Sequence, residues 1–218
     1  MFSVIFDMDG TLLDTQRICI PAWDYAGDKQ SIEAMGSHIP YVCGMNELGW
    51  SSYLEDNFPG LDIITFKKDM REYININLKV KFMKGAPELM KFLKNKNIKM
   101  ALASGSSMGS IVHHLTEVDA LDSFDVIVSG KEVEHGKPAP DIFLLTAERL
   151  GVPPEECFVF EDSANGVKAA HAAGMKCIGI PDVVEFSEDV KKLMFAELSS
   201  LDEAIEVFKK ELKGMVLS

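Results

Sequence analysis

Acidic residues stand close together at two places in this sequence. Asp7 and Asp9 are two residues apart near the start of the chain, and Glu161 and Asp162 are adjacent in its second half. On an extended segment, residues i and i+2 point to the same side, so both carboxylates of the first pair can face one ligand. We predict that Asp7 is a nucleophile and that Asp9 moves protons to and from the reacting atoms. An isolated pair of this spacing would more often be a solvated turn.

Two further segments carry residues that can bind an anion. Lys137 stands between a glycine and a proline and offers a fixed point charge. Ser104 can donate its hydroxyl, or it can simply cap the helix that follows. We expect Gly105 and the two serines after it to open that helix, so that their backbone N–H groups also face an anion.

Short apolar runs alternate with amphipathic stretches from Gly85 onward, and one more run opens the chain. Each run is too short for a helix and is bounded by Gly, Ser, Pro or Asp, which is typical of buried strands. The predicted strands cover residues 3–6, 100–103, 126–128, 158–160 and 177–180. Strands that alternate with helices imply right-handed βαβ units, so we expect an α/β fold with a Rossmann-like parallel sheet. The candidate functional residues follow these strands, at the sheet edge where ligands bind in such folds.

Residue types that begin and end helices mark the stretches between the strands. Asp141 is predicted to cap a helix that ends at Gly151, and an alanine-rich helix is predicted over residues 163–173. Ser200 and Glu203 have the spacing of a capping box before a final amphipathic helix.

Residues 15–80 differ from the rest because their apolar side chains recur at helical spacing and no strand pattern is present. We predict a helical cap of about four short helices inserted after the first strand. The predicted domains are an α/β core of residues 1–14 and 81–218 and a cap of residues 15–80. Such a lid closes over a ligand crevice, so we expect residues 15–20 and 79–84 to act as hinges.

Composition excludes several classes of function. The 218 residues include 22 basic and 34 acidic residues, and the formal net charge of −12 argues against a partner that is a nucleic acid or an anionic membrane. No apolar run approaches the roughly 18 residues of a membrane span, and no signal peptide is evident. The four cysteines lack a metal-binding or disulfide pattern, so we expect buried free thiols and a cytoplasmic location. No protein partner is evident.

Four motifs in order resemble those of the haloacid dehalogenase-like phosphohydrolases. They read DMDGT (residues 7–11), Ser104, GKPAPD (residues 136–141) and EDSANG (residues 161–166). The resemblance covers the whole chain, and the segment between the first two motifs is similar to the helical cap of that family. It implies a phosphatase that forms a phosphorylated aspartate on Asp7 and acts on a small phosphorylated metabolite.

The charges of the predicted site require a cation. Four carboxylates and Lys137 alone would repel a phosphate dianion, and oxygen ligands select a hard ion, hence Mg²⁺. The resemblance implies that the metal ligands are the Asp7 carboxylate, the Asp9 backbone carbonyl and Asp162, with Glu161 assisting. Asp9 lies beside other carboxylates, which favours its neutral form and lets it protonate the leaving oxygen. The resemblance also implies that Ser104, Gly105 and Lys137 hold the phosphate.

Two other functions use similar residues. A receiver-like phosphoaspartate switch also combines Asp, Ser or Thr, Lys and an acidic pair, but in the opposite order along the chain and without a cap. A phosphomutase similar to β-phosphoglucomutase shares the core and the cap, and would need cationic anchors for a second phosphate. At the positions expected for those anchors this chain has Cys19, Cys43-Gly44, Glu47 and Ser107. Because Glu47 is expected to repel a second phosphate, the sequence favours a phosphatase acting on a monophosphate.

Overall fold

A six-stranded parallel sheet forms the centre of the protein. The computed structural model describes residues 2–216, and within them every pair of neighbouring strands is parallel, in the order β3-β2-β1-β4-β5-β6. The strands are β1 Ser3–Phe6, β2 Met100–Ser104, β3 Val126–Ser129, β4 Cys157–Glu161, β5 Lys176–Gly179 and β6 Ala196–Glu197. The fold is therefore the α/β, Rossmann-like fold that the sequence predicts.

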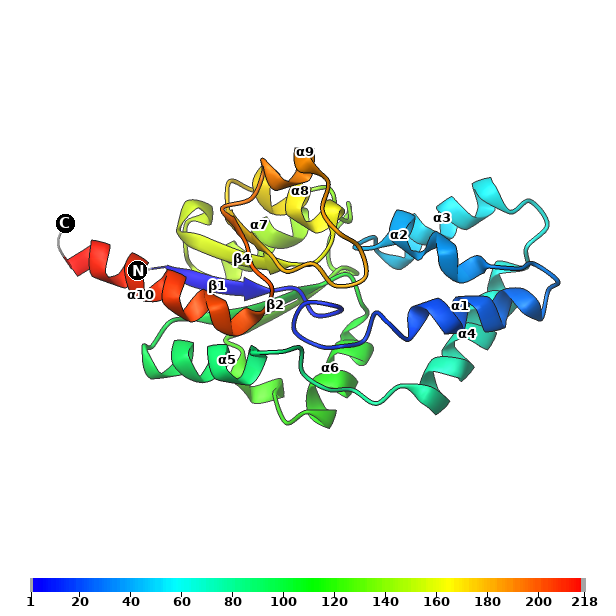
Figure 1. Ribbon diagram of the computed structural model, residues 1–218, viewed down its shortest axis with the longest axis horizontal. Coiled ribbons are helices and arrows are strands. Elements are labelled where there is room, and N and C mark those ends of the chain that lie inside the picture. Colours follow the sequence, from blue (N-terminus) through cyan, green and yellow to red (C-terminus); the bar gives the residue numbers. More distant parts are fainter. Residues whose placement is uncertain (1, 217–218) are drawn as a thin grey trace.

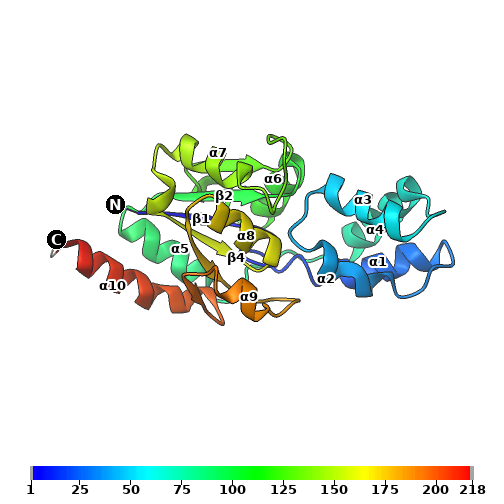
Figure 2. The same ribbon diagram turned by 90° about the horizontal axis from the view of Figure 1, so that it is seen from above.

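Helices cover both faces of the sheet (Figures 1 and 2). Side chains of α5, α6 and α10 pack on one face together with Phe6 and Phe160, whereas those of α7, α8 and α9 pack on the other with Ile5 and Val159. Because both faces are covered, the interior residues of the central strands are apolar on both sides and show no alternation, and the polar residues Ser3, Ser104 and Glu161 stand at strand ends. The helices are α5 Ala86–Asn95, α6 Met108–Glu117, α7 Asp141–Leu150, α8 Ala164–Ala172, α9 Glu188–Lys191 and α10 Ala204–Val216, with short 3₁₀ turns η2 Leu121–Ser123, η3 Pro154–Glu156 and η4 Leu201–Glu203.

Three details of the core differ from the sequence prediction. Strand β6 was missed, because its two residues form no apolar run. Asp141 does not cap α7: Pro140 occupies the cap position, and the Asp141 carboxylate lies 3.1 Å from the His135 ring. Ser200 makes no capping hydrogen bond, and Glu203 accepts one from the backbone N–H of Ser199, so the predicted capping box does not form.

A separate group of helices lies beyond one end of the sheet (Figures 1 and 2). Trp23, Leu54 and Phe66 are at the centre of its own apolar cluster, and Trp23 meets Phe66 edge to face. This cluster gives the helices an interior independent of the sheet. The group consists of α1 Cys19–Asp28, η1 Met35–His38, α2 Ile39–Val42, α3 Glu47–Asn57 and α4 Ile63–Asn77. We propose that it is the cap expected over residues 15–80.

The chain passes between the two groups of elements at two neighbouring points. Leu13 and Phe82 form an isolated antiparallel bridge, the Asp14 N–H donates to the carbonyl of Lys81, and the side chains of Asp14 and Lys81 form an ion pair of 3.0 Å. The outgoing and returning segments are therefore joined side by side.

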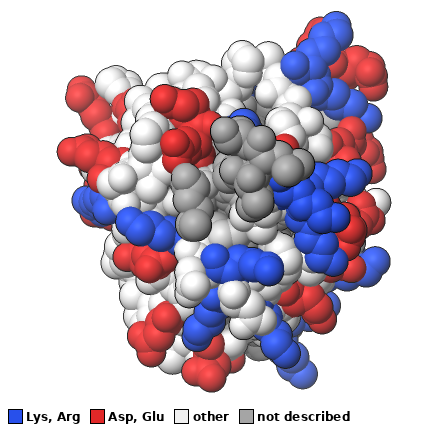
Figure 3. Space-filling model, turned by 90° about the vertical axis from the view of Figure 1, so that its left-hand side faces the viewer, with Lys and Arg blue, Asp and Glu red and all other residues white. Residues whose placement is uncertain are grey.

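The surface at one end of the molecule carries side chains of both charges. On the face that carries the termini, acidic and basic side chains are interspersed (Figure 3). None of the helices within residues 2–216 combines the length and apolar character needed to cross a bilayer. All four cysteines are free thiols: Cys157 and Cys177 are buried, as predicted, whereas Cys19 and Cys43 are only half-buried because they border the pocket described below.

Candidate active site

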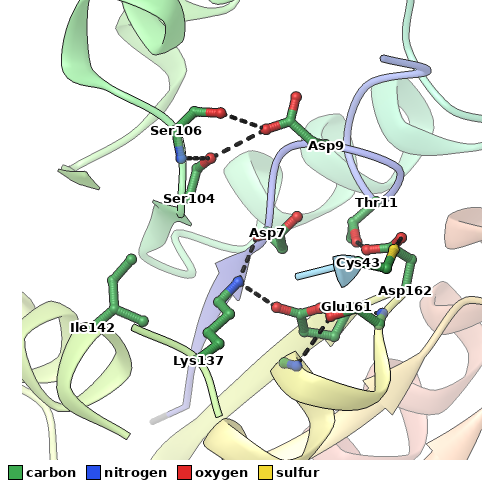
Figure 4. A network of polar contacts seen from close by, with 12 residues as sticks. Asp7, Asp9, Thr11, Cys43, Ser104, Ser106, Lys137, Ile142, Glu161 and Asp162 are labelled. Carbon is green, nitrogen blue, oxygen red and sulfur yellow. Dashed lines mark hydrogen bonds and ion pairs between the residues drawn. The ribbon is translucent and has the colours of Figure 1, made fainter. Parts of the chain in front are cut away.

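The predicted site residues converge at the carboxyl edge of the sheet. Asp7 directly follows β1, Ser104 ends β2, and Glu161 ends β4 on the other side of β1. The strand order reverses at β1, with β2 on one side of it and β4 on the other. Open α/β sheets leave a crevice for ligands at such a point. Lys137 comes from the segment between β3 and α7 and reaches the same place (Figure 4).

Three carboxylates are buried together beside one lysine. Oxygen atoms of Asp7, Glu161 and Asp162 all lie within 4.8 Å of one another. The ammonium of Lys137 donates to Asp7 Oδ1 at 2.6 Å and also to Glu161 Oε1. Thr11 donates its hydroxyl to Asp162 at 3.1 Å. We call Asp7, Glu161, Asp162 and Lys137 the carboxylate cluster.

Burial dominates the electrostatics of the carboxylate cluster. It raises the pKa of Asp7 to about 8; Lys137 opposes this rise, while Glu161 and Asp9 add to it. The pKa of Asp162 is also raised, by burial and by the charges of Glu161 and Asp7. Burial lowers the pKa of Lys137, but Asp7 and Glu161 outweigh that effect, so its pKa lies above the ordinary value. The lysine therefore stays charged among acids that gain a proton readily.

The donor set of this cluster fits a hard divalent cation. Three buried carboxylates facing one lysine leave an excess of negative charge that a cation would offset. Asp7, Glu161 and Asp162 contribute carboxylate oxygens to the group, whereas the side chain of Asp9 does not belong to it. The Asp9 backbone carbonyl accepts a hydrogen bond of 3.0 Å from Gln16 Nε2, and a carbonyl keeps a second lone pair for a cation.

Helix α8 holds Glu161 in place. Ser163, the N-cap residue of α8, donates its hydroxyl to Glu161 Oε2 at 3.0 Å and accepts from the N–H of Gly166. A Cβ atom at Gly166 would lie 1.9 Å from the Glu161 carboxyl carbon. Only glycine therefore lets this helix approach the carboxylate so closely.

Asp9 points away from the carboxylate cluster and toward hydroxyl groups. Thr15 donates to Asp9 Oδ1 at 2.6 Å, and Ser106 donates to Oδ2 at 2.8 Å. The Ser104 hydroxyl lies 3.4 Å from the same oxygen (Figure 4). The Asp9 side chain is thus held apart from Asp7, on the side where the β2 segment ends.

The loop after β2 differs from the prediction in its detail. Helix α6 begins only at Met108 and is capped by Ser107, so Gly105 lies in a loop and not in the first turn of a helix. Ser104 is not the helix cap either: its hydroxyl accepts from the N–H of Ser106. The Ser129 hydroxyl supports this loop by donating to the Ser106 carbonyl at 2.6 Å.

A pocket of about 630 Å³ lies between this edge and the helices beyond it. Asp7, Asp9, Gly105 and Lys137 line its core side, and the cap side supplies an apolar wall. The apolar wall consists of Trp23, Ile39, Val42, Trp50, Met70, Ile74 and Leu78. The size and the mixture of apolar walls with a few polar groups suit a small molecule.

The loop between α2 and α3 closes one side of the pocket by packing on the core. The Cys43 carbonyl accepts from the Asn165 amide at 2.9 Å, and the Cys43 thiol lies 3.0 Å from Gln16 Oε1. Gly44 has a φ of +76°, and a Cβ there would lie 2.2 Å from the Ser163 hydroxyl. The contacts with Asn165 and Ser163 join the loop to the same α8 N-terminus that positions Glu161.

Glu47 is surrounded by cations, which corrects the charge argument made from the sequence. Its carboxylate lies 3.1 Å from Lys67, 3.1 Å from Arg71 and 3.3 Å from Lys131. Positive charges outnumber the single negative charge, so this part of the wall attracts an anion and does not repel it. We call these four residues the cation cluster. Sequence reasoning considered Glu47 alone and missed the partners that the fold brings to it.

Several other site residues were absent from the sequence-based list. Thr11 and Ser163 lie inside the motifs and could have been found there. Thr15 and Gln16 belong to no motif, and only the folded chain brings them to Asp9.

Comparison with known proteins identifies the family of this chain. The family model of haloacid dehalogenase-like hydrolases matches residues 3–174. The chain belongs to this family. As a member of the haloacid dehalogenase-like hydrolases, it is an enzyme.

Named relatives are similar over most of their length. A phosphorylated carbohydrates phosphatase of Thermotoga maritima is 33% identical over 221 residues, which cover 97% of this chain and all of the relative. The fructose-1-phosphate phosphatase YqaB of Escherichia coli K12 is 32% identical over 188 residues, which cover 82% of this chain and 95% of the relative. The β-phosphoglucomutase structure from Clostridium difficile has the same fold, with a TM-score of 0.82 at 21% identity over both whole chains.

Proposed function

We propose that this protein is a Mg²⁺-dependent phosphatase that hydrolyses a small phosphomonoester, a sugar phosphate or a similar metabolite, through a phosphorylated aspartate. The observation that carries the proposal is the position of Asp7: buried at the end of β1, bonded to Lys137 and open to the pocket. Relatives named as phosphatases of phosphorylated carbohydrates support the substrate class.

In the first step, an Asp7 carboxylate oxygen forms a bond to phosphorus as the bond between phosphorus and the ester oxygen breaks. The leaving oxygen takes a proton from Asp9, which lines the same pocket as Asp7 and accepts hydrogen bonds from Thr15 and Ser106. In the second step, Asp9 removes a proton from water, which attacks phosphorus and releases phosphate and the Asp7 carboxylate.

Two sets of groups would offset the negative charge of the substrate phosphate: hydrogen-bond donors and a metal ion. We assign Lys137, Ser104 and the Gly105 backbone N–H to the phosphoryl oxygens. We assign the metal to Asp7, the Asp9 carbonyl, Glu161 and Asp162. Bound there, Mg²⁺ would offset the charge of the phosphate and polarise its bonds to oxygen. We also propose the hinges at residues 15–20 and 79–84, since closure of the helices excludes bulk water.

A phosphomutase is the second candidate, and the cation cluster is the observation that favours it. In a mutase, the phosphoryl group of Asp7 would pass to a sugar hydroxyl and not to water.

The test supplies Mg²⁺ with a panel of sugar phosphates and measures free phosphate. A separate reaction supplies β-glucose 1-phosphate with a trace of glucose 1,6-bisphosphate and follows glucose 6-phosphate. Phosphate release supports the phosphatase, whereas rapid formation of glucose 6-phosphate with little free phosphate would establish the mutase.

A further inference from the structure

The cation cluster joins the cap side of the pocket to the core side. Glu47 is the first residue of α3, Lys67 and Arg71 lie on α4, and Lys131 follows β3 in the core. Glu47, Arg71 and Lys131 all line the pocket that contains Asp7. The cluster therefore belongs to the wall of the substrate pocket and not to a remote surface.

The cations have more hydrogen-bond capacity than Glu47 can use. An ammonium has three N–H donors and a guanidinium has five, whereas one carboxylate offers two oxygens. The side chains of Arg71 and Lys131 are 59% and 49% exposed, so their remaining donors can reach a solute. Burial raises the pKa of Glu47, but Lys67 and Lys131 outweigh this and lower it, so the carboxylate stays charged.

The excess of positive charge around Glu47 contrasts with the chain as a whole, which is strongly acidic and has a net charge of −12. Three cations around one acid create a local positive potential at the pocket, which attracts anions. The Glu47 carboxylate itself shows which kind of group these cations bind.

We propose that Arg71 and Lys131 form a second anion subsite and that the substrate carries, besides the phosphate transferred to Asp7, a second carboxylate or phosphate group. This inference rests on the proposed function and specifies its substrate class. Glu47 holds the cations together before the substrate arrives. Because Arg71 belongs to the cap and Lys131 to the core, an anion held by both also favours the closed arrangement.

The experiment compares pairs of phosphomonoesters that differ in a second charge. Glycerol 3-phosphate and 3-phosphoglycerate test a carboxylate, while fructose 1-phosphate and fructose 1,6-bisphosphate test a second phosphate. The initial rate of phosphate release gives kcat/KM for each compound, and the selectivity is the ratio within each pair. Measuring a ratio cancels any general loss of activity or folding in a variant.

We expect the wild type to prefer the doubly anionic member of at least one pair, and that pair identifies the second group as carboxylate or phosphate. Lys131→Gln and Arg71→Gln should each lower the ratio roughly tenfold, mainly through KM, as expected for loss of one charge-assisted hydrogen bond. Glu47→Gln should raise the ratio, because it removes the competing anion. Lys192→Gln is the matched control, since Lys192 is 73% exposed and pairs with Asp189 on α9.

The subsite would be overturned if the enzyme turns over the members that carry only the transferred phosphate and none of the three variants changes either ratio. The cluster would then be only a structural link between cap and core. Absence of phosphate release and of phosphoryl transfer from every compound would instead overturn the proposed function, and the subsite with it.

Discussion

The carboxylate cluster and the cation cluster have opposite compositions. In the first, Asp7, Glu161 and Asp162 face one lysine, Lys137; in the second, three cations surround one acid, Glu47. Each contains a single internal counter-ion, and each has an excess of charge that a bound ion or group of the opposite sign would neutralise.

Their burial differs as much as their sign. The Lys137 side chain is 3% exposed, whereas that of Lys131 is 49% exposed. Charges removed from water interact strongly and are costly to leave uncompensated, while exposed pairs contribute little to stability. The comparison suggests a division of roles: the buried cluster performs the chemistry, and the exposed cluster selects what enters.

The largest effect is expected from Asp7→Asn. The substitution keeps the size of the side chain but removes the nucleophilic carboxylate, so turnover should fall by at least ~10³-fold. Phosphate release under saturating substrate measures it, with Asp189→Asn, an exposed aspartate, as the control. Activity close to that of the wild type would remove Asp7 from the mechanism.

Removal of the metal should have the next largest effect. Dialysis against EDTA should lower activity at least ~10²-fold, and Mg²⁺ should restore it, because the carboxylates otherwise repel the substrate phosphate. Ca²⁺ should inhibit, since it takes longer bonds and more ligands than Mg²⁺. Undiminished turnover in EDTA would contradict the role assigned to the carboxylate cluster.

A Lys→Gln substitution in each cluster compares how much the two lysines contribute to stability. Lys137→Gln leaves buried carboxylates without their partner and should cost about 3–5 kcal/mol of unfolding free energy together with most of the activity. Lys131→Gln should cost less than about 1 kcal/mol. Urea unfolding of both variants measures the difference, and equal losses would show that burial does not distinguish the two sites.

Stability without metal should depend on pH. The folded state raises the pKa of Asp7 from 3.8 to about 8, so the folded protein binds this proton more tightly than the unfolded chain. The stabilisation is complete below the unfolded value and is lost as pH rises through the folded value. In EDTA the melting temperature should therefore fall by several degrees between about pH 5 and about pH 8. Asp7→Asn should flatten this slope, and an unchanged slope would contradict the raised pKa.

The smallest effect is expected from salt. The cation cluster is partly exposed, so raising NaCl from about 0.05 M to about 0.5 M should reduce the preference for doubly anionic substrates about twofold to threefold. The kcat/KM of the members that carry only the transferred phosphate should change less. Equal sensitivity of both members of a pair would show that salt acts at the transferred phosphate and not at the cation cluster.

The carboxylate cluster was largely predictable from the sequence. Each of its residues either stands at the end of a buried strand or belongs to a motif that follows one. Parallel strands bring their carboxyl ends together, so Asp7, Ser104 and Glu161 had to meet once the strands were recognised. The apolar runs that define those strands are strong signals in a sheet covered on both faces.

The cation cluster was not predictable in this way. Glu47, Lys67 and Lys131 lie on separate elements, and their meeting depends on how the helices beyond the sheet dock on the core. The same is true of Thr15 and Gln16, whose side chains reach Asp9 only after the chain turns back. Local patterns also misplaced the start of α6, since the hydroxyls of Ser104 and Ser107 are both plausible caps and only tertiary contacts decide between them.

The paired crossing segments have a consequence for how this molecule can be altered. Because the Asp14 N–H donates to the Lys81 carbonyl at 2.9 Å, the whole stretch between them leaves and re-enters the sheet domain at nearly the same place. A stretch whose ends meet can be replaced without moving the strands of the sheet apart. A lineage could therefore exchange this stretch for another and acquire new selectivity, provided that the new stretch replaces the contacts of Thr15 and Gln16 with Asp9.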